Sequence, residues 1–259
     1  MTPLVSVVIP CFNSGKYLPE ALESVFKAKK NFEIEIIIAD DGSGDTATLE
    51  LLNKLENEGS AKVLRKSNGG PASARNLGVK SAHGKYILFL DSDNRILPDF
   101  LSQTIPVLEK NPTVAVVYGE ARFFGEFSNR RAFESGPFNI DKLISNNYID
   151  ICSLVRRTAL EQAEGMDESR LLIGFEDWEF WIHLVSLKWQ FVFVGEPLFE
   201  YRLRDDSLFA GRLTDENYKA VKKYIYKKHS DLILERFNIL FHESEFYRHD
   251  KLEMVFSRH

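Results

Sequence analysis

The sequence predicts an α/β fold with a doubly wound, mostly parallel central sheet. Two observations predict it. Short, nearly continuous apolar runs at residues 4–9, 34–39 and 86–90 alternate with amphipathic segments of helical spacing, and acidic or glycine-containing turns directly follow the runs. Runs of this kind are typical of strands buried on both faces, and their alternation with helices indicates βαβ units.

The first 112 residues follow this alternation element by element. A further strand is expected at 61–65, and a helix is expected to begin at Pro71, since proline suits the first helical position. The other two helices are each expected to bury one apolar face. The side chains of these faces are Leu18, Leu22, Val25 and Phe26 in the first helix, and Leu49, Leu52 and Leu55 in the second.

After residue 112 the pattern becomes less regular, and a small mixed or antiparallel portion of the sheet is expected there. A helix should begin near Glu176, and charged amphipathic helices should follow from Thr214. The remaining expectations are a strand at 113–118, an irregular stretch with Phe123, Phe124, Phe127 and Phe133, and strands at 149–155, 190–194 and 199–203.

We therefore expect one domain over residues 1–210 and a helical extension over 211–259. Within the domain, residues 1–112 and residues 113–210 would form two halves. The apolar face of the extension would dock on the core, form a homodimer or contact a membrane surface.

Composition narrows the class of protein. The net charge of −5 gives no basic footprint for nucleic acid. Two cysteines, far apart in sequence, form neither a disulfide framework nor a zinc motif. No secretory leader and no run of 18 apolar residues is seen. These features favour a cytoplasmic protein, with a peripheral position at the inner face of the membrane left open.

Two acidic clusters follow predicted strands: Asp40 and Asp41 after one, Asp91 and Asp93 after another. Each by itself is compatible with ordinary turn and helix-cap aspartates. Together they fall at the carboxyl edge of a parallel sheet, which is where such sheets bind ligands.

The spacing of Asp91 and Asp93 brings both carboxylates to one side of an extended or turning segment. Such a pair suits a hard cation, Mn2+ or Mg2+, whose other positions would be filled by phosphate and water. The turn at residues 68–71, with Asn68, opens a helix N-terminus that would favour an anion. Arg75, one turn later, would contact phosphate or form a salt bridge.

A third group of residues comprises Glu176 and Asp177 at a predicted helix start, with Trp178 and Trp181 behind them. Acidic residues at this position complement the helix dipole, which is the structural interpretation. Apolar surroundings would also raise the pKa of a carboxylate toward neutrality and make it a better base.

Five ordered motifs give the chain a family resemblance. They are VSVVIPCFN (5–13), ADDGSGDTA (39–47), NGGPASARNLG (68–78), YILFLDSDN (86–94) and GFEDWEFW (174–181). Over residues 4–204 the chain resembles a family 2 glycosyltransferase of the GT-A fold. The resemblance implies an inverting transfer of sugar from a nucleotide-sugar, usually a UDP-sugar, to a hydroxyl of a polysaccharide, lipid-linked glycan or similar acceptor.

The resemblance also implies roles for individual residues. Phe12 would lie against the nucleotide base, in a pocket lined by the Pro10 region, and Asp41 would accept the base N–H, with Asp40 beside it. Asp93, with Asp91, would hold the metal against the diphosphate. Asp177 would be the general base, supported by Glu176.

The match departs from the family pattern at one position. Many members carry Tyr-Arg-x-His after the last core strand, whereas this chain has Arg204 in place of the histidine. A guanidinium can contact phosphate but does not ligate a metal. We therefore expect a metal held by carboxylates and diphosphate, with Arg204 or Arg202 on phosphate.

Two other functions remain possible from the sequence. A sugar nucleotidyltransferase uses a similar sheet and metal, but it typically carries a glycine-rich loop with a lysine after the first strand; Lys16 does not have that spacing. A non-catalytic sugar-nucleotide-binding module would be expected to have lost some of the carboxylates at Asp41, Asp91, Asp93 and Asp177.

Overall fold

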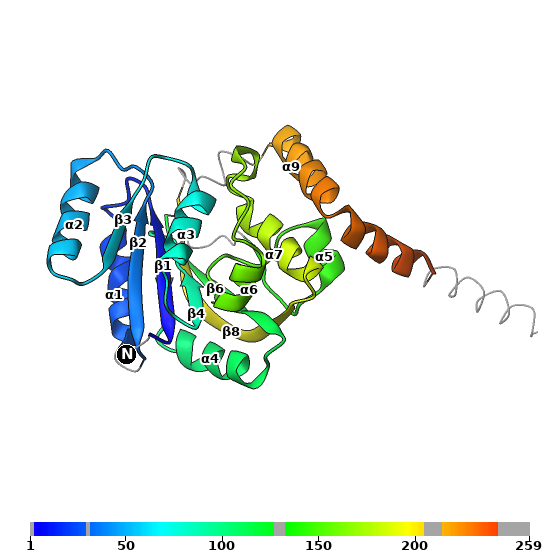
Figure 1. Ribbon diagram of the computed structural model, residues 1–259, viewed down its shortest axis with the longest axis horizontal. Coiled ribbons are helices and arrows are strands. Elements are labelled where there is room, and N and C mark those ends of the chain that lie inside the picture. The colour runs from blue at the N-terminus through cyan, green and yellow to red at the C-terminus, as the bar shows by residue number, and fades with distance from the viewer. Residues whose placement is uncertain (1–2, 30–31, 127–132, 205–213, 243–259) are drawn as a thin grey trace, which may run out of the picture.

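A computed structural model describes residues 3–29, 32–126, 133–204 and 214–242 (Figure 1). Its strands are β1 (Val5–Cys11), β2 (Ile34–Asp40), β3 (Lys62–Arg65), β4 (Tyr86–Phe89), β5 (Arg95–Ile96), β6 (Val114–Gly125), β7 (Leu154–Arg156) and β8 (Gln190–Leu203). Its helices are α1 (Leu18–Lys29), α2 (Thr46–Asn57), α3 (Pro71–Lys80), α4 (Phe100–Lys110), α5 (Ile140–Ser145), α6 (Arg157–Gln162), the short 3-10 helix η1 (Arg170–Leu172), α7 (Glu176–Ser186) and α9 (Asp215–Lys228).

The described strands form one sheet in the order β3-β2-β1-β4-β7-β6-β8-β5. The pairs among β1 to β4 are parallel, β7 runs antiparallel to both of its neighbours, and β6 pairs with β8 in parallel. The expected α/β fold, with a parallel part and a mixed part, is therefore confirmed. The halves expected at 1–112 and 113–210 share this sheet, since β5 of the first half pairs with β8 of the second.

Helices cover both faces of the sheet because its strands are apolar on both sides. Val7 and Ile9 of β1 point into a core that includes residues of α1, α2 and α4. Val8, between them, points into a second core that includes residues of α3, α5, α6, α7 and α9. This alternation follows from the two-residue period of a strand, and it makes the molecule a three-layer structure.

The elements of the first half lie close to their expected positions. Helix α3 begins at Pro71, after Gly70 with a positive φ of 92°. The prediction of the buried face of α1 is wrong at one residue. Leu18, Leu22 and Val25 are buried, but Phe26 is 37% exposed. In α2, Leu52 and Leu55 are buried, and Leu49 is half-buried.

Three expectations for the second half are wrong in extent. Strand β6 runs on to Gly125, so Phe123 and Phe124 belong to a strand and not to an irregular stretch. Strand β7 comprises only Leu154–Arg156, because residues 149–153 form bends. The two strands expected at 190–194 and 199–203 are one strand, β8. Phe127 lies outside the described residues.

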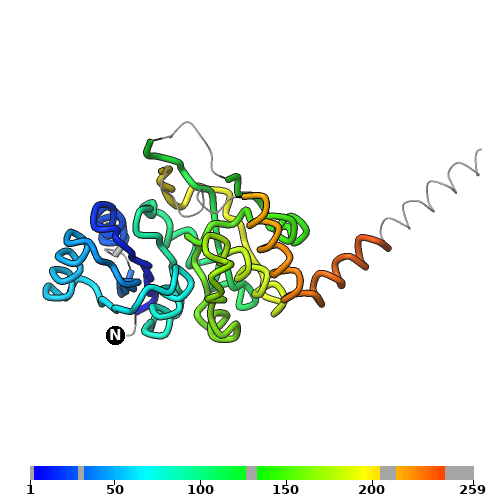
Figure 2. Tube along the Cα trace, turned by 90° about the horizontal axis from the view of Figure 1, so that it is seen from above, coloured from blue at the N-terminus to red at the C-terminus, as the bar shows by residue number. Residues whose placement is uncertain are grey.

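The C-terminal helix begins where the sequence predicts it. The side chain of Thr214 accepts a hydrogen bond from the Asn217 N–H and caps α9. Residues 230–242 are again helical, and this second segment leaves the body of the molecule (Figure 2). Within the described ranges, no helix combines the length and apolarity needed to cross a membrane.

Candidate active site

The carboxyl ends of the parallel strands bring the first two motifs together. Cys11 at the end of β1 lies beside Asp40 at the end of β2, and β4, on the other side of β1, runs in the same direction. The loops that follow these three strands therefore meet at one edge of the sheet, as expected for a ligand site in an α/β fold.

Asp40 and Asp41 are both almost completely buried and fix the loops around them. Asp40 accepts a hydrogen bond from the Ser43 N–H at 3.0 Å, the turn role expected of such an aspartate. Asp41 accepts bonds from the N–H groups of Gly69 and Gly70 at 2.9 and 2.8 Å and from Lys66 Nζ at 2.8 Å. The anion expected at the N-terminus of α3 is thus, in this structure, the carboxylate of Asp41.

The neighbouring nucleotide-site candidates differ in exposure. Asn68 donates its side-chain N–H to the backbone carbonyl of Asp41 at 3.1 Å. Phe12 follows β1 with 49% of its surface exposed, and Pro10 is half-buried in the strand. An exposed aromatic ring beside a rigid strand end offers a flat surface on which a base can stack.

Arg75 joins the acidic clusters of the two halves. Its side chain is 4% exposed and forms ion pairs of 2.7 Å with Asp91 and with Glu176. The two carboxylates raise the pKa of the guanidinium against the opposing effect of burial, so Arg75 is charged at every accessible pH. The salt-bridge interpretation of Arg75 is confirmed, and the bridge fixes α7 against the loop after β4.

Asp177 lies at the N-terminal end of α7 with both carboxylate oxygens hydrogen-bonded. Asn147 Nδ2 donates to Oδ2 at 2.9 Å, and the Trp178 N–H donates to Oδ1 at 2.8 Å. Burial, and then the charge of Glu176, raise the pKa of Asp177 to about 7. A carboxyl group of that pKa exchanges protons near neutral pH, as a general base must.

Helix α7 is held rigidly by Trp178 and Trp181, the two tryptophans that the sequence analysis placed behind Glu176 and Asp177. Trp178 and Trp181 are completely buried. Their indole N–H groups donate to the carbonyls of Leu143 and Ile149 at 2.6 and 2.9 Å. Both acceptors flank the segment that contains Asn147, so the same packing positions Asp177 and its hydrogen-bond donor.

The loop after β4 carries the candidate metal ligands. Burial and the charge of Asp91 raise the pKa of Asp93 to about 6, and Arg204 Nε lies 3.4 Å from Asp93 Oδ2. In the described part of the chain, no set of three His, Cys, Asp or Glu side chains is placed to hold a metal alone. Two neighbouring carboxylates fit Mn2+ or Mg2+ if phosphate and water complete the shell.

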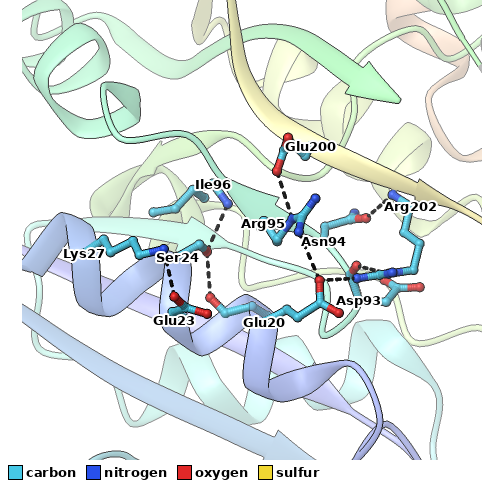
Figure 3. Close-up of polar contacts among 11 residues, drawn as sticks. Glu20, Glu23, Ser24, Lys27, Asp93, Asn94, Arg95, Ile96, Glu200 and Arg202 are labelled. Carbon is cyan, nitrogen blue, oxygen red and sulfur yellow. Dashed lines mark hydrogen bonds and ion pairs between the residues drawn. The ribbon is translucent and has the colours of Figure 1, made fainter. Parts of the chain in front are cut away.

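Figure 3 shows the polar network that holds this loop. The guanidinium of Arg202 donates to the backbone carbonyl of Asp93 at 3.0 Å and to the carboxylate of Glu20 at 2.7 Å. The backbone N–H of Arg202 donates to Asn94 Oδ1 at 2.9 Å. Arg95 also pairs with Glu20, at 3.1 Å. Arg202 is therefore engaged in holding the loop, and of the two candidate arginines only Arg204 pairs with the carboxylate of a candidate metal ligand, Asp93.

Two residues of the site were not found from the sequence. Asn147 contacts Asp177. Asp150 faces the same acidic cluster: burial, and then the charges of Asp91 and Asp177, raise its pKa well above the usual value. Neither has a local sequence signal, because both lie in an irregular segment between α5 and β7, which the apolar pattern assigned to a strand at Asp150 and left unassigned at Asn147.

Known proteins match this chain in sequence. A family model described as glycosyl transferase family 2 matches residues 6–163, more than half of the chain. An uncharacterized glycosyltransferase of Rickettsia felis is 45% identical over 108 residues, which are 41% of this chain and 17% of that protein. The chain thus spans about one sixth of the length of that relative.

Solved structures share the fold. S. aureus TarS (residues 1–349) superposes with a TM-score of 0.62 at 25% identity, over 76% of this chain and 60% of that one. The mannosyltransferase PcManGT of Pyrobaculum calidifontis, in complex with GDP-Man and Mn2+, has a TM-score of 0.59 at 17% identity, over 82% and 60% of the two chains.

Proposed function

The chain belongs to glycosyl transferase family 2 and has the GT-A fold, and from this premise we propose that it transfers a sugar from a nucleoside diphosphate sugar to an acceptor hydroxyl. One observation carries the proposal. Asp177, with a pKa raised to about 7, is tied through Glu176 and Arg75 to the Asp91 loop. Asp177, the proposed base for the acceptor, and the loop of Asp91 and Asp93, the proposed carboxylate pair for the donor, are thereby held in one rigid unit.

The donor would bind at the carboxyl edge of the first strands, with UDP as the nucleotide. The base would stack on Phe12 near Pro10, and Asp41, with Asp40 and Asn68 behind it, would accept the base N–H. A further structure of TarS is in complex with UDP-GlcNAc, which supports this choice of donor class.

Asp93 and Asp91 would hold Mn2+ or Mg2+. When bound, the metal would neutralise charge on the diphosphate as the leaving group departs. The presence of Mn2+ with a nucleotide-sugar in PcManGT supports this assignment. Arg204, which pairs with Asp93 here, would turn to the diphosphate, since guanidinium binds phosphate well.

The reaction would be a single displacement. The acceptor oxygen forms a bond to the anomeric carbon while the bond from that carbon to the diphosphate oxygen breaks. The acceptor proton passes to Asp177, and the nucleoside diphosphate leaves with the bonding electron pair. Attack from the face opposite the leaving group inverts the anomeric centre, which proton NMR of the first-formed product would test.

The acceptor half would comprise residues 113–210, and the acceptor would be a polysaccharide or lipid-linked glycan. Asp150 and Asn147 lie in this half beside Asp177, where an acceptor hydroxyl must approach. We place the protein in the cytoplasm. The C-terminal helices would serve a contact with the membrane or with a second copy.

The variant Asp177→Asn tests the proposal most directly. The amide cannot accept the proton, so release of UDP from a UDP-sugar in the presence of acceptor and Mn2+ should fall by about 10²- to 10⁴-fold. Thermal stabilisation by UDP and Mn2+ should persist, because donor binding does not use this group. Asp99→Asn, an exposed matched control, should keep full activity.

The outcomes separate the alternatives. Undiminished transfer by Asp177→Asn would exclude Asp177 as the base. Formation of a nucleotide-sugar from a nucleoside triphosphate and a sugar phosphate would indicate a nucleotidyltransferase. Stabilisation by UDP-sugars without any release of UDP would indicate a binding module.

A further inference from the structure

Aromatic rings and arginine side chains alternate beside the loop of Asp93. The guanidinium carbon of Arg202 lies 4.3 Å from the centre of the Phe124 ring and 5.0 Å from the centre of the Tyr17 ring. The guanidinium carbon of Arg204 lies 4.7 Å from the centre of the same Tyr17 ring. Cations at such distances are attracted by the negative face of an aromatic ring. Tyr17 is therefore the ring that joins Arg204 to this series.

The backbone of Tyr17 is fixed by the turn that begins helix α1. Its N–H donates to the Ser14 carbonyl at 2.9 Å, and its carbonyl accepts from the Glu20 N–H at 3.0 Å. The next residue, Leu18, is completely buried. Tyr17 is half-buried, and Lys16 Nζ also lies 5.1 Å from the centre of its ring. The ring is thus a fixed support with cations around it.

The two arginines are held in different ways. The side chain of Arg202 is 13% exposed, and it donates to the Asp93 carbonyl and to Glu20, as Figure 3 shows. The side chain of Arg204 is 20% exposed, and its contact with Asp93 is longer, at 3.4 Å from Nε to Oδ2. Arg202 therefore has strong bonds besides its ring contacts. For Arg204, the arginine that the proposed function assigns to the diphosphate, the ring is the larger part of the support.

A ring contact and a phosphate contact use different parts of a guanidinium group. An aromatic ring stacks on the flat face, whereas the N–H donors lie in the plane of the group and point outward from its edge. Arg204 can therefore exchange its contact with Asp93 for bonds to phosphate oxygens while it stays on the Tyr17 ring. A side chain that is held in place before the ligand arrives loses less entropy on binding.

We propose that Tyr17 is a positioning residue for the donor diphosphate, and that it acts by holding the guanidinium of Arg204 beside Asp93. The inference rests on the proposed function, because it takes a nucleoside diphosphate as the ligand of Arg204. Tyr17 itself makes no bond to the nucleotide. Loss of the ring should therefore weaken the binding of the diphosphate and leave the binding of the nucleoside unchanged.

The test is titration of the full chain with UDP in the presence of Mn2+, by calorimetry, and with uridine, by ligand-observed NMR. Tyr17→Leu should raise the Kd of UDP about 3- to 30-fold, as expected for the loss of a cation–π contact. It should leave the Kd of uridine unchanged. Tyr17→Phe keeps the ring and should bind UDP as tightly as the natural chain. Phe26→Leu, which removes an exposed ring from the same helix, is the matched control and should also bind normally.

A double-mutant cycle tests whether Tyr17 acts through Arg204. Arg204→Ala alone should raise the Kd of UDP about 10- to 100-fold, because hydrogen bonds between charged groups are lost. In the Arg204→Ala background, Tyr17→Leu should have no further effect, since residues that act as one unit are not additive. Thermal melting of each variant without ligand measures any change in stability separately from binding.

The proposal is overturned if Tyr17→Leu binds UDP as tightly as the natural chain, or if its effect adds in full to that of Arg204→Ala. It is also overturned if Tyr17→Leu weakens uridine binding equally, which would mean that the ring contacts the base. Sugar transfer by a natural chain that binds UDP, with no effect of Tyr17→Leu, overturns this inference alone. A natural chain that binds no nucleotide overturns the proposed function as well.

Discussion

The carboxylate of Asp177 is subject to opposing effects on its pKa. Burial and the adjacent Glu176 raise it, whereas Arg75 and the hydrogen bonds from Trp178 and Asn147 lower it, with a net pKa of about 7. Removing any one of these contacts should therefore move the pKa and the pH at which the group acts as a base. Asn147 is uncharged, so its removal leaves no ion unpaired, although it also breaks the bond from the Ile149 N–H to Asn147 Oδ1.

We expect kcat/KM to rise with pH and to level off above about 7, because only ionised Asp177 accepts a proton. Asn147→Ala removes a hydrogen bond that favours the ionised form, so the rise should shift to higher pH and kcat should fall, with the donor KM unchanged. A pH–rate profile measures both effects. Asn53→Ala, on α2, is the control, and an unshifted profile in Asn147→Ala would refute the positioning role.

The loss of Arg75 should strongly reduce stability. It is 4% exposed and compensates two carboxylates. Arg75→Met leaves both without their partner, which should lower the free energy of unfolding by about 3–5 kcal/mol. Arg65→Met removes an exposed ion pair with Glu56 and should cost less than about 1 kcal/mol. Urea denaturation of the two variants measures the difference; equal losses would mean that the Arg75 bridge is not a structural one.

At the scale of elements, helix α3 shows how a local residue choice sets packing. Gly78 lies where the helix crosses β1, and a Cβ there would overlap Val8 Cγ1. The close approach brings the N-terminus of α3, with Gly69 and Gly70, into contact with Asp41. The glycine therefore helps to place the loop that binds Asp41.

Gly78→Ala should force α3 away from β1 and lower the free energy of unfolding by about 1–3 kcal/mol. Alanine has the higher helix propensity, so a gain in stability would show that the packing constraint is absent. Gly136→Ala, where a Cβ would meet nothing within 4 Å, is the matched control in the same denaturation experiment.

Strands β6 and β8 are longer than the local sequence pattern predicted. The two strands pair in parallel along the whole of β6, from Val114 to Gly125. The register shifts on both sides of Glu120, so that Glu120 lies opposite Pro197 of β8. Glycine and proline in this stretch predict a break locally. Pairing across the sheet overrides that preference, because bulges accommodate the irregular residues while the ladder continues on either side.

At the scale of the whole molecule, the site is assembled from parts that lie far apart in the chain. Arg75 and Glu176 are separated by 101 positions and form an ion pair of 2.7 Å. Glu20 and Arg202, separated by 182 positions, are also 2.7 Å apart. The sheet makes this possible by placing the ends of β1, β2 and β4 at one edge, with α7 packed beside them.

The sequence by itself determined the fold class and the first strands and helices, and it predicted the residues of the proposed donor site. These depend on local properties: buried strands are continuous apolar runs, and Asp40, Asp41, Asp91 and Asp93 follow such runs directly. The resemblance added Asp177 on α7 as the proposed general base, which stays a prediction until it is tested by substitution. The structure has placed Asp177 beside Asn147, and its neighbour Glu176 is linked through Arg75 to Asp91.

Only the tertiary structure decided what depends on contacts between distant residues. The pKa of Asp177, the double salt bridge of Arg75, the engagement of Arg202 with Glu20, and the proximity of Asn147 and Asp150 to the site all arise from long-range packing.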